Sequence, residues 1–383
     1  MNIGIIGSGT MGIGIAHATA NKEHKTLVFD SSPSSLKHGK EKLYILLDKL
    51  VEKGKYSLEQ SNNIKNKIIF TEDLNDIKNS ELVIEAIIEK LKIKKEVFTK
   101  IENLVSVDCI IASNTSSLSI ASIASACKNS KRVIGMHFFN PANLMPLVEI
   151  IPAIQTSQDT TNKTKKILLE LNKVIVLAKD TPGFIVNRVA RPFYGESLRI
   201  YEEGIANFET IDWALKEIGG FKMGPFELMD YIGNDINYTV TKTVFKEFYY
   251  DPRYKPSFTQ KRLMEAGYFG RKSGMGYYNY RNEEPKNINQ NRELAKKITL
   301  RVLAMLINEA SDALFLNIAS KEDIDLAMTN GVNYPKGLLK WADEIGIKNI
   351  LKILEDLYKT YCEDRYRPSP ILRKMSAENN TFY

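Results

Sequence analysis

The first thirty residues constrain this chain most, because strand and helix patterns alternate there around a glycine-rich turn. An apolar run leads into a GxGxxG segment, after which small and apolar residues recur at helical spacing. A second apolar run then ends at Asp30. This order predicts a β-α-β unit that binds a dinucleotide at the helix N-terminus. The residues of the turn that are expected to bind it are Gly7, Ser8, Gly9, Thr10, Met11 and Gly12.

Asp30 favours NAD over NADP as the cofactor. A carboxylate at the end of the second strand can accept hydrogen bonds from both hydroxyls of an adenosine ribose, and it repels a 2′-phosphate. No arginine follows Asp30 directly. The sequence therefore predicts NAD rather than NADP, and the alternative is a glycine-rich turn in some other parallel-sheet protein.

Length and composition limit the class of protein. A chain of 383 residues with 43% hydrophobic content predicts a globular protein of two or three domains. No run approaches the ~20 apolar residues of a membrane span, and a strand that starts at Asn2 leaves no room for a signal peptide. Three widely spaced cysteines without metal-ligand spacing favour reduced thiols, no metal site and a cytoplasmic location.

The net charge of +7 suits a phosphate-bearing, anionic substrate. No basic and aromatic recognition motif accompanies the charge, so we expect no nucleic-acid partner. Lysines on solvated helix faces explain most of the charge. The predicted helix 33–54 is rich in lysine, and the plain explanation for it is a solvated amphipathic helix.

Strand and helix patterns alternate up to about residue 180, and Thr181-Pro182-Gly183 then marks a boundary. Beyond it the pattern is helical, with one long helix predicted from Phe184 to Glu203. The predicted fold is an α/β Rossmann domain with a mostly parallel sheet, followed by two tandem all-α domains. Their predicted limits are 1–180, 181–283 and 284–383.

The two helical domains are predicted from an internal repeat. At an offset of 113 residues, Arg188 aligns with Arg301 and Glu196 with Glu309, and the match continues through Gly233 and Gly346. Such a constant offset indicates a duplication. Leu300 stands where Asn187 would fall, so the second copy is expected to be non-catalytic.

His137 differs from the other three histidines, because it ends a predicted strand at the sheet edge where the cofactor should lie. Glu149 lies on the next predicted strand. If these strands are neighbours, the carboxylate can fix the imidazole tautomer and stabilise its charged form. The pair is a candidate general base with its partner.

The chain resembles the L-3-hydroxyacyl-CoA dehydrogenases, and the short-chain 3-hydroxybutyryl-CoA dehydrogenases in particular. The resemblance rests on eight segments up to about residue 280: GSGTMGIGIA at 7–16, EAIIEKLKIKKEVF at 85–98, SNTSSL at 113–118, GMHFFNP at 135–141, LVEII at 147–151, KDTPGFIVNR at 179–188, MGPFELMDYIG at 223–233 and GRKSGMGYY at 270–278. It implies a Rossmann domain followed by a helical dimerisation domain.

The resemblance also implies roles for single residues. His137 would be the catalytic base and Glu149 its partner, while Ser116 and Asn187 would bond the substrate's 3-oxygen and its surroundings. The residues expected along NAD are Glu89, Lys94, Ser116, Asn140 and, from the helical region, Lys272. Lys53 would meet the phosphates of coenzyme A.

The implied reaction is NAD-dependent oxidation of (S)-3-hydroxyacyl-CoA, with 3-hydroxybutyryl-CoA as the expected substrate, in fatty acid metabolism. Two alternatives stay open: a dehydrogenase of a free hydroxy or sugar acid such as gulonate, and a non-enzymatic structural protein that kept the fold. The chain departs from the family at Pro146, where a basic residue is usual, and at Phe221-Lys222 before MGPF. The duplication predicts an intramolecular pseudo-dimer, so that a monomer becomes possible.

Overall fold

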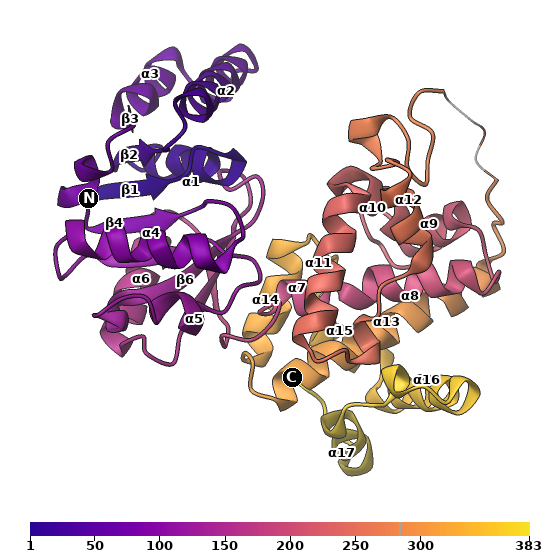
Figure 1. The fold of residues 1–383 in the computed structure, drawn as a ribbon. Coiled ribbons are helices and arrows are strands. Elements are labelled where there is room, and N and C mark those ends of the chain that lie inside the picture. Colours follow the sequence, from indigo (N-terminus) through magenta and orange to yellow (C-terminus); the bar gives the residue numbers. More distant parts are fainter. Residues whose placement is uncertain (283–284, 286) are drawn as a thin grey trace. The chain divides into compact units, whose positions relative to one another are not determined.

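The computed structural model describes residues 1–282, 285 and 287–383 (Figure 1). They form two compact units, Met1–Thr181 and Pro182–Tyr383. The predicted limit between the two helical domains, at residues 283 and 284, lies outside the described residues. None of the described helices is long and apolar enough to cross a membrane.

The first unit is built on an eight-stranded sheet in the order β3-β2-β1-β4-β5-β6-β7-β8. Every neighbouring pair is parallel except β6 and β7. The predicted mostly parallel sheet is thus confirmed. The strands are β1 (Asn2–Ile6), β2 (Lys25–Phe29), β3 (Ile68–Thr71), β4 (Leu82–Glu85), β5 (Ile110–Ser113), β6 (Val133–Phe138), β7 (Leu147–Pro152) and β8 (Val174–Leu177).

Helices connect these strands. Ser32 caps α2 by accepting a hydrogen bond from the backbone of Ser35, and a proline follows in the first turn. The helices are α1 (Thr10–Ala20), α2 (Pro33–Glu52), α3 (Leu58–Lys67), α4 (Leu91–Leu104), α5 (Ile120–Ala124) and α6 (Gln158–Glu170), with short 3-10 turns η1 (Leu74–Asn79) and η2 (Ser130–Arg132). The sequence analysis did not predict α3, in which Ile64 is the one buried aliphatic residue.

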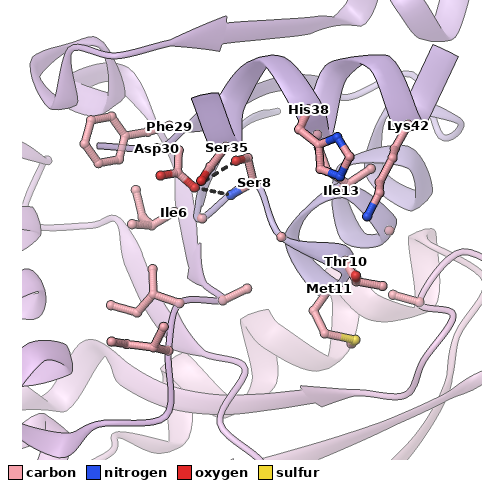
Figure 2. Close-up of a pocket in the computed structure, with 18 of the residues that line it drawn as sticks. Ile6, Ser8, Thr10, Met11, Ile13, Phe29, Asp30, Ser35, His38 and Lys42 are labelled. Atoms are coloured by element: carbon pink, nitrogen blue, oxygen red, sulfur yellow. Dashed lines mark hydrogen bonds between the residues drawn. The ribbon is translucent and has the colours of Figure 1, made fainter. Parts of the chain in front are cut away.

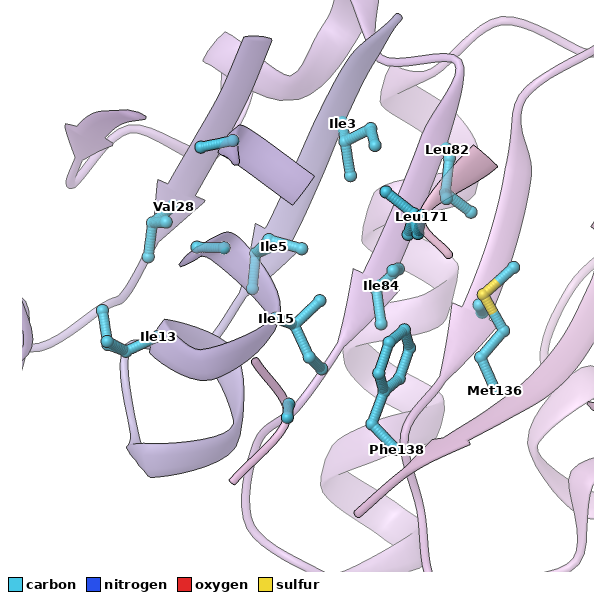
Figure 3. Packing of buried hydrophobic residues seen from close by; sticks show 14 of the residues in the cluster. Ile3, Ile5, Ile13, Ile15, Val28, Leu82, Ile84, Met136, Phe138 and Leu171 are labelled. Carbon is cyan, nitrogen blue, oxygen red and sulfur yellow. The ribbon is translucent and has the colours of Figure 1, made fainter. Parts of the chain in front are cut away.

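The core of this unit lies between the sheet and its helices, as Figure 3 shows for α1. Ile15 of α1 is fully buried, and it belongs to the same cluster as Ile5 and Ile84 of the adjacent strands β1 and β4. β1 and β4 are paired in parallel, and both carry apolar residues that are buried in this core, as is usual for the inner strands of a parallel sheet. This is the point where the strand order reverses, and ligands bind there in open α/β sheets.

The described secondary structure of the second unit is helical, apart from isolated β-bridges between Gly270 and Met275 and between Met275 and Asn279. Its elements are α7 (Val186–Val189), α8 (Arg191–Glu202), α9 (Phe208–Glu217), α10 (Pro225–Ile232), α11 (Asn234–Glu247), η3 (Pro252–Tyr254), α12 (Phe258–Glu265), η4 (Arg271–Ser273), α13 (Arg292–Phe315), α14 (Lys321–Gly331), α15 (Leu338–Ile345), α16 (Ile347–Tyr361), η5 (Asp364–Tyr366) and α17 (Pro370–Glu378). The predicted helical region is thus confirmed.

One helix prediction was wrong in detail. The single helix predicted over Phe184–Glu203 begins at Val186 and is divided into α7 and α8. Phe184 has a φ of 47°, directly after Gly183 at 74°, and this left-handed conformation cannot belong to a right-handed helix. The hydrophobic pattern alone does not reveal such a turn, because residues 183–186 are all buried.

The repeat found in the sequence is also a repeat of structure. Helices α9 to α11 correspond in order to α14 to α16, each pair starting 113 residues apart. In both copies an aspartate accepts two backbone N–H groups at the start of the next helix, with distances of 2.8 to 3.0 Å. These residues are Asp212, which is buried, at the start of α10 and Asp325, which is half-buried, at the start of α15. The two copies therefore share local chemistry as well as helix order.

The copies exchange equivalent ion pairs where α7 and α8 pack on α13. Nε of Arg188 donates to Oε1 of Glu309 at 2.6 Å, and Nε of Arg301 donates to Oε1 of Glu196 at 2.6 Å. The hydroxyl of Tyr254 adds a bond to Glu309, and that of Tyr366 adds one to Glu196. Such reciprocal pairing is what an approximate twofold axis between the copies produces.

Candidate active site

The glycine-rich turn at the end of β1 is shaped by two glycines that tolerate no side chain. Gly7 has a φ of 107°, and a Cβ there would lie 2.6 Å from the carbonyl oxygen of Ala86. A Cβ on Gly12 would lie 1.9 Å from the carbonyl oxygen of Gly7. Gly9, by contrast, has open space in front of its missing Cβ and caps α1 without a side-chain bond. This turn leaves room for a phosphate group at the N-terminus of α1.

Beside this turn lies a cavity of about 1010 Å³ (Figure 2). Asp30 is on its wall, where one carboxylate oxygen accepts bonds from both the N–H and the hydroxyl of Ser8 at 2.8 Å. The other oxygen accepts the N–H of Ser32 at 3.0 Å. Of the residues predicted to bind cofactor, those that line the cavity are Gly7, Ser8, Gly9, Thr10, Met11, Asp30 and Asn140. A glycine turn, a helix N-terminus and a carboxylate on β2 fit the pyrophosphate and ribose of NAD.

Lys94, which is buried, and Glu89, which is exposed, belong to one ion-pair network near the same sheet edge. The Lys94 ammonium, 1% exposed, lies 2.6 Å from Oε1 of Glu85 and 3.2 Å from Oε2 of Glu89. Burial opposes ionisation of Glu89, but Lys94 and hydrogen bonds from Thr115 and Ser116 outweigh it and hold its pKa below the ordinary value. The lowered pKa keeps Glu89 ionised, so its carboxylate can accept hydrogen bonds. Lys94 is fixed between the carboxylates of Glu85 and Glu89.

Ser116 lies in the turn after β5, where Glu89 orients the backbone. The N–H of Ser116 donates to Oε1 of Glu89 at 3.0 Å, and the hydroxyl of Ser117 donates to the same oxygen at 3.2 Å. Asn114, which the sequence analysis did not single out, accepts the N–H of Phe138 at 2.8 Å. It thereby ties this turn to the end of β6, next to His137.

His137 and Glu149 face each other across β6 and β7, which are neighbours and antiparallel. They are register partners, and Nδ1 of His137 lies 2.6 Å from Oε2 of Glu149. Both are buried, at 6% and 0% exposure. A fully buried carboxylate at this distance holds the imidazole through Nδ1, which directs Nε2 to any reacting group.

Lys173 stabilises the loop after His137 through hydrogen bonds to its backbone. Its ammonium donates to the carbonyl oxygens of Ala142 at 2.7 Å and Met145 at 2.8 Å. Burial lowers the pKa of Lys173 to about 8. The loop carries Asn140 and Ala142 into the wall of the cavity, so Lys173 supports that wall. Sequence reasoning missed Lys173 because a lysine at a strand start is usually exposed.

The other predicted site residues lie elsewhere. Asn187, in α7 of the second unit, is the one half-buried residue in an otherwise buried run over 183–194. Lys272 pairs with Asp235 of the same unit at 2.6 Å. Lys53 is exposed at the end of α2 and does not line the cavity. Their predicted roles stay predictions.

Comparison with known proteins decides the family. Residues 2–181 match the NAD-binding domain of 3-hydroxyacyl-CoA dehydrogenase. Residues 183–280 and 298–381 match the C-terminal domain of the same enzyme. The chain belongs to the 3-hydroxyacyl-CoA dehydrogenase family. It is an NAD-binding oxidoreductase, which confirms the prediction of NAD and the activity that the resemblance implied.

Several relatives of this dehydrogenase are known. It is 34% identical to 3-hydroxyadipyl-CoA dehydrogenase of Escherichia coli, over 97% of its own length and 96% of that protein. It is 38% identical to 3-hydroxybutyryl-CoA dehydrogenase of Clostridioides difficile, over 73% of its own length and 99% of that protein. The crystal structure of 3-hydroxybutyryl-CoA dehydrogenase from Escherichia coli has a TM-score of 0.93 and 34% identity, covering 99% of this dehydrogenase and 98% of that chain.

These matches differ in how much of the dehydrogenase they include. The first relative spans both helical repeats, whereas the Clostridioides difficile enzyme corresponds to about the first three quarters of the chain. Within the residues that the structure describes, no group of three or more His, Cys, Asp or Glu side chains could hold a metal ion.

Proposed function

We propose that this dehydrogenase oxidises (S)-3-hydroxyacyl-CoA to 3-ketoacyl-CoA reversibly, with His137 as general base held by Glu149. The observation that carries the proposal is the 2.6 Å contact between Nδ1 of His137 and the buried carboxylate of Glu149. The glycine turn and Asp30 would hold NAD, which would supply the hydride acceptor for the oxidation. The family match supports the reaction class.

The proposed proton path uses both imidazole nitrogens. Glu149 accepts a hydrogen bond from Nδ1–H, which leaves the lone pair on Nε2 to take the proton of the 3-hydroxyl. The imidazolium that results is stabilised by the adjacent carboxylate. Proton transfer to a positioned base typically contributes ~10² to 10⁴ in rate. Ser116 and Asn187 are proposed to bond the 3-oxygen and its surroundings, with Lys53 near the phosphates of coenzyme A.

The acyl group is proposed to be short. The relatives named above act, by their names, on 3-hydroxybutyryl-CoA and 3-hydroxyadipyl-CoA, which have four and six acyl carbons. We therefore extend the expected 3-hydroxybutyryl-CoA to a range of four to six carbons. The net charge of +7 favours an anionic substrate such as a coenzyme A ester.

An NADH-oxidation assay tests the reaction. We expect turnover of acetoacetyl-CoA and of 3-oxohexanoyl-CoA, and little turnover of free acetoacetate or keto-gulonate. Turnover of a free acid in preference to its thioester would favour the hydroxy- or sugar-acid alternative. Protein that is folded and binds NADH but turns over none of these compounds would favour a structural role and refute the proposal.

We propose one active site per chain, with the second helical repeat covering the first as an intramolecular pseudo-dimer. The reciprocal pairs of Arg188 with Glu309 and Arg301 with Glu196 support this arrangement. The free cysteines Cys109, Cys127 and Cys362 support a cytoplasmic location. Light scattering should give a mass near 43.5 kDa for the intact chain. A stable dimer that places Arg188 opposite Glu196 of another copy would contradict the pseudo-dimer.

A further inference from the structure

Arg191, at the start of α8, is buried without a carboxylate to balance its charge. The buried arginines in the described part of the chain are Arg132, Arg188, Arg191, Arg253, Arg301 and Arg365. All except Arg191 have an aspartate or glutamate oxygen within 4 Å. Because a buried charge is costly unless it is paired, an arginine that lacks an acid invites an anionic ligand.

The groups around Arg191 leave donors unused. Nη1 of Arg191 donates to the hydroxyl of Thr241 on α11 at 3.2 Å, but Nε has no hydrogen-bond partner. The hydroxyl of Tyr334, 5% exposed and in the loop after α14, also has none. The ring of Tyr194 lies under the guanidinium, with Cζ 4.9 Å from its centre. Guanidinium and phenol hydroxyl are together a donor set for a carboxylate.

The fold itself does not require this polar cluster, as the second repeat demonstrates. At the offset of 113 residues, Arg191 corresponds to Ala304, Tyr194 to Ile307 and Thr241 to Leu354. In the opposite direction Tyr334 corresponds to Phe221. The four equivalent side chains are all apolar and buried. The same helix packing is thus stable without the charge, so the charge has another use.

The position of Arg191 relative to Asn187 indicates that use. The two residues are four apart in a helical stretch that continues across Ala190, and such residues are neighbours, with Cβ atoms ~5–6 Å apart. Asn187 is the residue proposed to bond the substrate near carbon 3. A carboxylate a few carbons beyond carbon 3 would therefore be within reach of the Arg191 guanidinium.

We propose that Arg191, together with the Tyr334 hydroxyl from the second repeat, binds the terminal carboxylate of a dicarboxylic 3-hydroxyacyl chain. The inference rests on the proposed function and adds the substrate class. It also gives the second repeat a direct part in recognition. Neutral acyl chains of the same length would leave the guanidinium without its anion.

The test compares 3-oxoadipyl-CoA with 3-oxohexanoyl-CoA, which differ only in a carboxylate or a methyl group at the chain end. We expect kcat/KM to favour 3-oxoadipyl-CoA by at least ~10², since a buried polar site rejects an analogue that lacks the matching group. Arg191→Met should bring this ratio to within ~10-fold of unity. Tyr334→Phe, which removes one hydroxyl, should lower it by ~10-fold.

Arg199→Met is the matched control. Arg199 lies on the same helix, but it pairs with Glu363 at 3.1 Å, so the ratio should stay as in the native protein. Turnover of 3-oxohexanoyl-CoA without preference for 3-oxoadipyl-CoA would overturn the inference and leave the proposed function intact. Failure with every ketoacyl-CoA would overturn the proposed function itself. If Arg191→Met does not fold, an unchanged ratio in Tyr334→Phe refutes the proposal.

Discussion

The reciprocal ion pairs of the second unit predict that two equivalent substitutions have unequal costs. Glu309→Gln removes a charge that faces Arg188 at 2.6 Å and Arg253 at 3.5 Å. After the change, Asp312 at 3.7 Å is the one carboxylate that remains within 4 Å of Arg188 among the described residues. Breaking a buried pair by removing one charge costs about 3–5 kcal/mol, so we expect a loss near that range in the free energy of unfolding.

Glu196→Gln is the symmetry-related control. Arg301 also donates to both oxygens of Glu203, at 2.8 and 3.0 Å, and these bonds survive the change. Burial also raises the pKa of Glu196 despite Arg301, whereas Arg188 and Arg253 overcome burial and lower the pKa of Glu309. The ionised form is thus held more strongly at Glu309. We expect Glu196→Gln to cost about 1–2 kcal/mol, the scale of one charged hydrogen bond.

The assay is urea unfolding followed by far-ultraviolet circular dichroism, together with kcat for acetoacetyl-CoA. Because Arg188 directly follows Asn187, kcat should fall in Glu309→Gln more than in Glu196→Gln. An equal or larger loss of stability in Glu196→Gln would refute the reasoning, since it would mean that the remaining bonds of Arg301 to Glu203 contribute nothing.

Three further outcomes are expected. His137→Gln should lower kcat by ~10³ while NADH affinity is nearly kept, because a base acts in the transition state; unchanged turnover would remove His137 from the mechanism. Asp30→Ala should weaken NAD binding and shift preference toward NADP, and an unaltered ratio of the two dissociation constants would mean that Asp30 does not select the ribose. Burial and the charge of Lys173 lower the pKa of His17 to about 4. Between pH 4 and 6.5 the unfolded chain therefore binds a proton that the folded one does not, and the free energy of unfolding should fall by up to about 3 kcal/mol as pH drops. His17→Gln should remove that slope, as measured by urea unfolding at several pH values.

The sequence predicts the parts of this fold that follow from local pattern. The β-α-β unit is readable because its glycines, apolar runs and Asp30 fall in order within thirty residues. The juxtaposition of His137 and Glu149 required only that their strands be neighbours. The break at Phe184 could not be predicted, since a positive φ at a phenylalanine depends on tertiary packing rather than on residue preference.

Buried polar groups are the second class that escapes sequence reasoning. Lys173 reads as a surface charge, yet the fold buries it and directs its ammonium to two backbone carbonyl oxygens. The buried ion pair of Lys94 with Glu85 is likewise not indicated by the sequence, although Lys94 is expected along NAD. Arg191 escapes for the same reason, because nothing in its neighbours in the sequence shows that no acid will face it. Such residues become visible only when elements distant in the chain, such as α8, α11 and the loop after α14, are placed together.

The covalent link between the two helical repeats changes how their association depends on dilution. Two separate copies would meet in a bimolecular step, so their stability would fall with protein concentration. Here α8 and α13 belong to one chain, and their contact is a unimolecular event with a fixed effective concentration. The packing of the helical unit should therefore be the same at low and at high protein concentration. Because the two repeats are separate stretches of one chain, each repeat can also change its sequence without the other having to change in the same way.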